Sequence, residues 1–167
     1  MNVSARQLSE QSLAEDFAEI LRETGADPRR ILLEITETSL MADIDNNLRV
    51  LQRLADLGMR VAVDDFGTGY SSLAQLTRLP VNVLKIDRAF VDGIETQSEN
   101  RAVNRAIVGL ARALGLKLVA EGVENIEQLL ELRALGCDYI QATYFIGRWK
   151  SRFLSTGLAT SSRSSRW

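Results

Sequence analysis

Short apolar runs alternate with amphipathic stretches along most of this chain. Five runs are brief, largely apolar and rich in β-branched residues, a pattern typical of buried strands. They occupy residues 31–37, 61–65, 83–87, 116–121 and 139–141. With the short segment at residues 1–4, we expect about six strands.

Helices are predicted between these strands, because apolar residues there recur three or four positions apart. The predicted helices cover residues 9–24, the stretch with Leu48, Leu51 and Leu54, residues 73–79, the stretch whose apolar face is Val103, Ile107, Leu110 and Leu114, and the stretch after Asn125. Asp43 or Asp45 would cap the second helix, and Pro80 would end the third. Strands that alternate with helices favour an α/β protein with a parallel sheet covered by helices.

The dipeptide Leu-Gly occurs at residues 57–58, 114–115 and 135–136, each time between a predicted helix and a predicted strand. Asp64 and Glu121 follow the first two glycines by six residues, and Gln141 follows the third by five. Polar residues therefore recur near the carboxyl ends of the strands, where parallel α/β folds place their ligands. This weak repeat predicts a site at that edge.

The stretch 61–72 places two adjacent carboxylates, Asp64 and Asp65, at the end of a buried strand. Two like charges side by side at the end of an apolar strand are unfavourable, so each carboxylate needs a cation, a hydrogen-bond donor or a proton. A single divalent metal ion satisfies both carboxylates at once. Gly67 and Gly69 permit a sharp turn, and Thr68 offers a hydroxyl to an anion. The alternative is a solvated pair of aspartates followed by an ordinary turn.

Composition narrows the chemistry. The 167-residue chain contains no histidine, which excludes Ser-His-Asp catalysis and histidine-based metal sites. A metal must therefore sit among oxygen atoms, which suits Mg²⁺, Mn²⁺ or Ca²⁺. The single cysteine, Cys137, is expected to be a small buried hydrophobe. No membrane span and no leader are evident, so we expect a cytoplasmic location.

The net charge of −2 hides an asymmetry between the two ends of the chain. Residues 139–167 hold five of the 20 basic residues and none of the 22 acidic residues, so the remainder carries a net charge of −7. That acidic body argues against nonspecific binding of DNA or RNA. From Arg148 onward, serines mix with basic residues, which predicts a Ser/Arg-rich disordered tail over residues 148–167.

Taken together, six segments resemble the EAL domain, a family of cyclic di-GMP phosphodiesterases with a modified eight-stranded TIM barrel. They are residues 2–7 (NVSARQ), 33–37 (LEITE), 64–72 (DDFGTGYSS), 84–87 (LKID), 120–124 (AEGVE) and Gln141. The resemblance extends from Asn2 to about Phe145 and implies a partial EAL domain over residues 1–147.

The resemblance also implies a role for each matching residue. Asn2, Glu34, Asp64 and Asp65 match metal ligands for a pair of Mg²⁺ or Mn²⁺ ions. Lys85, Glu121 and Gln141 match the groups that position or activate the attacking water. Glu37 matches the acid that steadies the glycine-rich loop with Gly67, Thr68 and Gly69. Taken singly, several of these residues have plainer interpretations: a structural pair of Lys85 with Asp87 or another acid, a solvated Glu34 or a disordered Asn2.

This sequence departs from the family pattern in two places. The namesake Glu-Ala-Leu, whose glutamate is a metal ligand in the family, has no counterpart and would lie before Met1. At the other end, residues 142–149 (ATYFIGRW) lack the family's Gly and Pro-containing turn. We therefore expect an incomplete barrel that lacks the first strands, because a complete one needs roughly 250 residues.

These observations lead to one hypothesis and two alternatives. The first is a cyclic di-GMP phosphodiesterase domain that makes linear pGpG by two-metal catalysis, with the activity of this fragment left open. The second is a noncatalytic cyclic di-GMP-binding or regulatory module. The third is a degenerate product with no stable fold. The resemblance also implies a homodimer.

Overall fold

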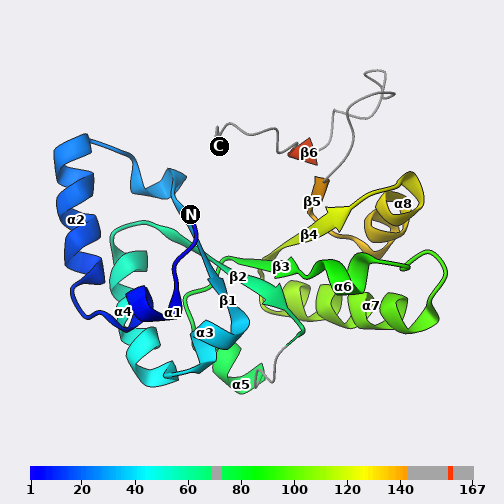
Figure 1. Ribbon diagram of the computed structural model, residues 1–167, viewed down its shortest axis with the longest axis horizontal. Coiled ribbons are helices and arrows are strands. Elements are labelled where there is room, and N and C mark those ends of the chain that lie inside the picture. Colours follow the sequence, from blue (N-terminus) through cyan, green and yellow to red (C-terminus); the bar gives the residue numbers. More distant parts are fainter. Residues whose placement is uncertain (69–72, 143–157, 160–167) are drawn as a thin grey trace. The chain divides into compact units, whose positions relative to one another are not determined.

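The computed structural model describes residues 1–68 and 73–142, and the backbone of residues 158–159 (Figure 1). These residues form two compact units, Met1–Val83 and Leu84–Trp167, which are described separately below. No helix of the described part is long and apolar enough to cross a membrane.

The first unit places two parallel strands among short and medium helices. Its elements are α1 (Ala5–Ser9), α2 (Leu13–Thr24), a 3₁₀ turn (Pro28–Arg30), β1 (Leu32–Thr36), α3 (Glu37–Met41), α4 (Ile44–Asp56), β2 (Arg60–Phe66) and α5 (Leu73–Leu76). Strand β1 pairs in parallel with β2, with Glu34 opposite Ala62 and Thr36 opposite Asp64. Residue Asn2 adds a further parallel bridge to Glu34 on the other side of β1.

The core of the first unit lies on one face of β1. Leu33 and Ile35 are 0% and 1% exposed, whereas their neighbours on the other face are half-buried. Helices α3 and α4 contribute fully buried leucines, including Leu40, Leu51 and Leu54. This division leaves the opposite face of the strand, which carries Glu34, available for a site.

The second unit repeats the alternation of strands and helices. Its elements are β3 (Val83–Ile86), α6 (Arg88–Val91), α7 (Ser98–Ala113), β4 (Lys117–Val123), α8 (Ile126–Leu135), β5 (Tyr139–Ala142) and β6 (Leu158–Ala159). Strand β4 pairs in parallel with β5, and β5 in parallel with β6. Helices α6, α7 and α8 all contact β4. Residues 143–157 and 160–167 lie outside the described part, so the predicted domain boundary and disordered tail stay predictions.

The three Leu-Gly dipeptides end their helices with one and the same backbone arrangement. Each glycine has a positive φ: 95° at Gly58, 69° at Gly115 and 97° at Gly136. The next residue then donates its N–H to a carbonyl five residues earlier: Met59 to Leu54, Leu116 to Ala111 and Cys137 to Leu132. This is the Schellman motif, in which glycine avoids the Cβ penalty of the left-handed region. The sequence repeat is therefore a structural one.

The structure differs from the predicted elements in several places. Residues 9–24 do not form one helix, because α1 ends at Ser9 and α2 begins at Leu13. The third predicted helix is shorter, since α5 ends at Leu76. Helix α7 buries Asn104, Ile107, Val108 and Ala111, while Val103 is 36% exposed, so its buried face is rotated from the predicted one. Asp43, and not Asp45, caps α4 through the N–H of Asn46.

Candidate active site

In the first unit, strand register brings Asn2, Glu34 and Asp64 to one face. The N–H of Val3 donates to the carbonyl of Glu34 at 2.9 Å, and the N–H of Glu34 donates to that of Met1 at 2.8 Å, so Asn2 lies directly beside Glu34. Asp64 lies opposite Thr36, two residues further along β1. Because alternate side chains share a face, the three oxygen-bearing side chains project the same way. Asn2 is therefore an ordered neighbour of Glu34.

The two adjacent aspartates differ in backbone conformation. Asp65 has a φ of 53°, the only positive φ of a non-glycine residue in the described part of the chain. Its N–H donates to Oδ1 of Asp64 at 3.1 Å. Aspartate is one of the few residues that adopt this left-handed region. Asp65 therefore bends the chain near the end of β2, and both aspartates are half-buried.

The turn after Asp65 is tied to a buried glutamate. Glu37 is 2% exposed, and its Oε2 accepts the N–H of Gly67 at 2.8 Å. Thr68 donates through its hydroxyl to the carbonyl of Asp65 at 2.8 Å. Gly69, the third residue expected in this loop, lies outside the described residues. A buried carboxylate on the first turn of α3 thus holds the beginning of the loop.

In the second unit, Lys85 of β3 and Glu121 of β4 form an ion pair. Lys85 Nζ lies 2.5 Å from Glu121 Oε1, and the two side chains are only 6% and 22% exposed. Burial of two charges is costly unless they are close together, and this pair meets that condition. The plainer interpretation, a structural pair of Lys85 with Asp87 or another acid, also agrees with this ion pair, because Glu121 is such an acid. Asp87 caps α6 through the N–H of Ala89.

A bulge in β4 places Glu121 beside Gln141. Ala120 pairs with Ile140, and Val123 pairs with Ala142, so Glu121 and Gly122 together face the single residue Gln141. Such a two-against-one count re-aims the side chains at the bulge. Lys85, Glu121 and Gln141 therefore come from neighbouring strands of the second unit, in the order β3-β4-β5.

The donor set of the first unit has the chemistry of a hard-cation site. One amide and three carboxylates supply only oxygen atoms, which suits Mg²⁺, Mn²⁺ or Ca²⁺. However, the described residues contain no group of three or more Asp, Glu or Cys side chains arranged to hold a metal ion. The ligand types therefore fit such an ion, while the carboxylates do not by themselves form a closed cage.

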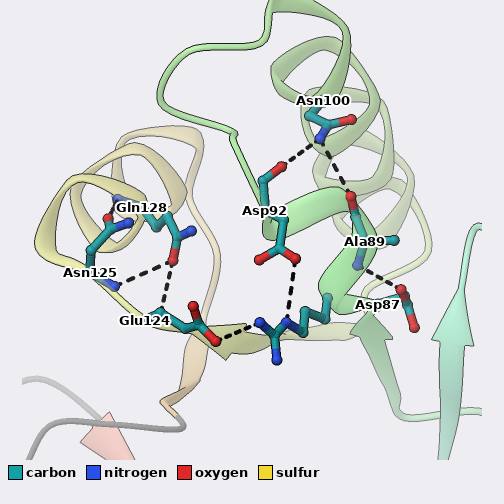
Figure 2. A network of polar contacts seen from close by, with 8 residues as sticks. Asp87, Ala89, Asp92, Asn100, Glu124, Asn125 and Gln128 are labelled. Atoms are coloured by element: carbon teal, nitrogen blue, oxygen red, sulfur yellow. Dashed lines mark hydrogen bonds and ion pairs between the residues drawn. The ribbon is translucent and has the colours of Figure 1, made fainter.

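Sequence reasoning missed two charged residues at the same strand ends. Arg88 comes three residues after Lys85, and Glu124 comes three residues after Glu121. Their side chains form a second ion pair, with Arg88 Nη2 2.6 Å from Glu124 Oε1 (Figure 2). The equal spacing of the two pairs along the chain was the signal available in the sequence.

Comparisons with known proteins agree on one relationship. The bifunctional diguanylate cyclase/cyclic di-GMP phosphodiesterase MucR of Pseudomonas aeruginosa is 42% identical over 148 residues, which are 89% of this chain and 22% of MucR. The cyclic di-GMP phosphodiesterase RocR of the same species is 43% identical over 144 residues, 86% of this chain and 37% of RocR. The chain thus spans well under half the length of these relatives.

Solved structures agree with this relationship. The PaMucR phosphodiesterase in complex with c-di-GMP matches with a TM-score of 0.78 and 43% identity, over 81% of this chain and 55% of that one. The manganese/cy-diGMP complex of Klebsiella pneumoniae BlrP1 matches with a TM-score of 0.74 and 32% identity, over 81% of this chain and 35% of that one.

These matches confirm the predicted fold class, an incomplete TIM-barrel-like α/β fold, since the chain aligns with only part of each solved chain. The family model of the EAL domain matches residues 1–147. The chain therefore belongs to the EAL domain family.

Proposed function

We propose that this chain is a cyclic di-GMP phosphodiesterase domain that hydrolyses one phosphodiester bond to give linear pGpG. The observation that carries the proposal is the Lys85–Glu121 pair, a cation and a candidate base held 2.5 Å apart and mostly out of water. Solved relatives with 43% and 32% identity contain c-di-GMP, which supports this substrate. Cyclic di-GMP is accordingly the expected ligand of the site.

Each side chain has a proposed task in that reaction. The Lys85 ammonium donates hydrogen bonds that orient the attacking water, and Glu121 accepts the proton that this water loses. Gln141, beside Glu121 across the bulge, offers its amide to the same water. Glu37 keeps the loop of Gly67, Thr68 and Gly69 in place through the N–H of Gly67.

The proposed cofactor is a pair of Mg²⁺ or Mn²⁺ ions held by Asn2, Glu34, Asp64 and Asp65. When bound, such ions lower the pKa of water and stabilise the attacking and leaving oxygens of the displacement. The manganese complex of the BlrP1 relative supports a divalent ion. Homodimer formation, a cytoplasmic location and the absence of DNA binding stay predictions of the resemblance and composition.

The decisive experiment is a hydrolysis assay of the purified chain with cyclic di-GMP and Mn²⁺, read by chromatography. We expect linear product, and we expect Glu121→Gln to lower the rate by at least about 100-fold, because a general base contributes 10²–10⁴-fold. Glu127→Gln, at an exposed glutamate of α8, is the matched control and should leave the rate unchanged. Thermal melts of all three proteins check that each is folded.

The outcomes separate the hypotheses. An active Glu121→Gln variant would contradict the role given to Glu121. A folded wild-type chain that makes no product would contradict the proposal that this chain is a phosphodiesterase.

A second candidate function is a noncatalytic cyclic di-GMP-binding module. One observation favours it: among the described residues, no three Asp, Glu or Cys side chains are arranged to hold a metal ion. Calorimetric titration with cyclic di-GMP at saturating Mn²⁺ tests it. Binding without turnover would support the module, whereas neither binding nor a cooperative melt would support the degenerate product.

A further inference from the structure

Two ion pairs, one after the other along the chain, connect the segment at the end of β3 with the segment at the end of β4. Lys85 pairs with Glu121, and three residues further along both segments Arg88 pairs with Glu124 at 2.6 Å. The first pair is mostly buried, whereas the side chains of the second are 54% and 43% exposed. An exposed pair contributes little to stability, so the position of the second pair needs another reason.

The aliphatic stem of Arg88 lies directly on the backbone of Gly122. A Cβ atom built on Gly122 would come within 2.6 Å of Arg88 Cγ and 2.9 Å of its Cβ and Cδ. Gly122 also has a φ of 67°, a conformation that favours glycine. It is the residue immediately after Glu121 and belongs to the bulge that faces Gln141. Arg88 therefore covers the bulge that sets the direction of Glu121.

Both ends of the Arg88–Glu124 pair are held by neighbouring elements (Figure 2). On one side, Arg88 Nε lies 3.4 Å from Oδ2 of Asp92, the residue that follows α6, and the carbonyl of Asp92 accepts a hydrogen bond from the side-chain amide of Asn100 in α7 at 2.7 Å. On the other side, the N–H of Glu124 donates to Gln128 of α8 at 2.8 Å. The guanidinium thus joins two anchored segments across the bulge.

We propose that Arg88 is a positioning residue. Its aliphatic stem packs against Gly122 and fixes the Glu121–Gly122 bulge, so that the Glu121 carboxylate reaches Lys85. Its effect on turnover rests on the proposed phosphodiesterase function, but its effect on the Lys85–Glu121 geometry does not. The ion pairs of Arg88 in the described part of the chain are with Asp92 and Glu124 and not with Lys85 or Glu121, so Arg88 acts through the backbone.

The key variant is Arg88→Met, which keeps most of the stem and removes the charge. We expect it to lower kcat for cyclic di-GMP by on the order of tenfold with KM changed less than about threefold, because small misplacements of a catalytic group slow the chemical step. Glu124→Gln removes the same pair from its other end and should act alike. Arg88→Lys, which keeps the charge, should restore most of kcat, and Arg105→Met, at an exposed position on α7, is the matched control.

A second measurement needs no turnover. The NMR shift of the Glu121 carboxylate carbon reports its pairing with Lys85, since Lys85→Met should move that signal. In the Arg88→Met background we expect Lys85→Met to move the Glu121 signal by less than half as much as it does in the wild-type background, because the Glu121 carboxylate no longer meets the Lys85 ammonium. In the Arg105→Met background the full response should remain. Thermal melts show whether each variant is folded. If Arg88→Met is unfolded, Glu124→Gln, which removes the same ion pair, is used in its place.

The two measurements separate the inference from the proposed function. An inactive wild-type chain in which Arg88→Met still weakens the Lys85–Glu121 response would overturn the phosphodiesterase proposal and support the positioning role. A full response in both Arg88→Met and Glu124→Gln would overturn the positioning role, whether or not the chain hydrolyses cyclic di-GMP. An equal loss of kcat in the Arg105→Met control would also overturn it.

Discussion

At the scale of single residues, Cys137 shows how burial controls chemistry in this chain. Its Sγ lies 3.1 Å from the carbonyl oxygen of Tyr139 and 3.5 Å from that of Leu118. Burial raises the pKa of the Cys137 thiol to about 12, because a thiolate would lose its hydration there. The residue is half-buried, so it only partly matches the small buried hydrophobe expected from the sequence.

We predict that Cys137 of the folded chain reacts with iodoacetamide at pH 8 at least about 100-fold more slowly than a free cysteine of pKa about 8.5. The rate should rise about tenfold per pH unit below the folded pKa, since only the thiolate reacts. Mass spectrometry of alkylated protein measures both. A native rate equal to that of the urea-unfolded chain would contradict the prediction.

The same raised pKa has a consequence for stability. The folded state holds the thiol proton more tightly than the unfolded state does, so the contribution of this group is complete below the unfolded value of about 8.5. It is lost as the pH rises from there towards 12.

At the scale of elements, the helix ends and the helix interiors make opposite demands on glycine. Gly115 follows α7 with a φ of 69°, whereas Gly109 lies inside α7, and an added Cβ would meet nothing within 4 Å at either position. The two positions therefore differ in backbone conformation and not in the room available for a side chain. Only the first requires glycine.

We predict that Gly115→Ala lowers the free energy of unfolding by about 1 kcal/mol, because alanine is strained in the left-handed region. Gly109→Ala should raise it by about 0.5–1 kcal/mol, because alanine is the better helix former. Urea denaturation of the two variants measures both changes. A Gly115→Ala variant as stable as the wild type would show that the helix end does not impose the glycine.

Most strands and the longer helices could be predicted from the sequence, whereas α3 and α6 could not. The strands β1 to β5 have apolar runs that mark them, and α4 and α8 have capping residues, Asp43 and Asn125, at the predicted places. Helices α3 and α6 contain only five and four residues, too few for an apolar period. Their only local marks are the caps Thr36 and Asp87, which also fit ordinary turns.

At the scale of the whole molecule, each unit brings together candidate site residues that are far apart in the sequence. The resemblance named the residues, and strand register explains why Asn2 lies beside Glu34 and why Gln141 lies beside Glu121. Arg88 and Glu124 were missed because an ion pair between two elements leaves no period in either one. Neither pattern nor spacing could reveal that Gly122 supports the stem of Arg88.

We predict that Asp64→Asn weakens Mn²⁺ binding by the chain at least about tenfold, because a neutral amide replaces a charged oxygen ligand. Electron paramagnetic resonance of free Mn²⁺ measures binding without requiring turnover. Asp56→Asn, at an exposed aspartate of α4, is the control and should bind like the wild type. An unchanged titration for Asp64→Asn would refute its assignment as a ligand.

The bulge in β4 also acts as a one-residue insertion that the rest of the strand absorbs. Leu118 and Ala120 are buried, and the extra residue lets Val123 take the next buried position in place of residue 122. Deleting Gly122 would therefore leave Val123 opposite Ala142 and preserve the alternation of the core, but it would remove the backbone on which the stem of Arg88 lies. The core is thus indifferent to the added residue, whereas the packing of Arg88 on the bulge depends on it.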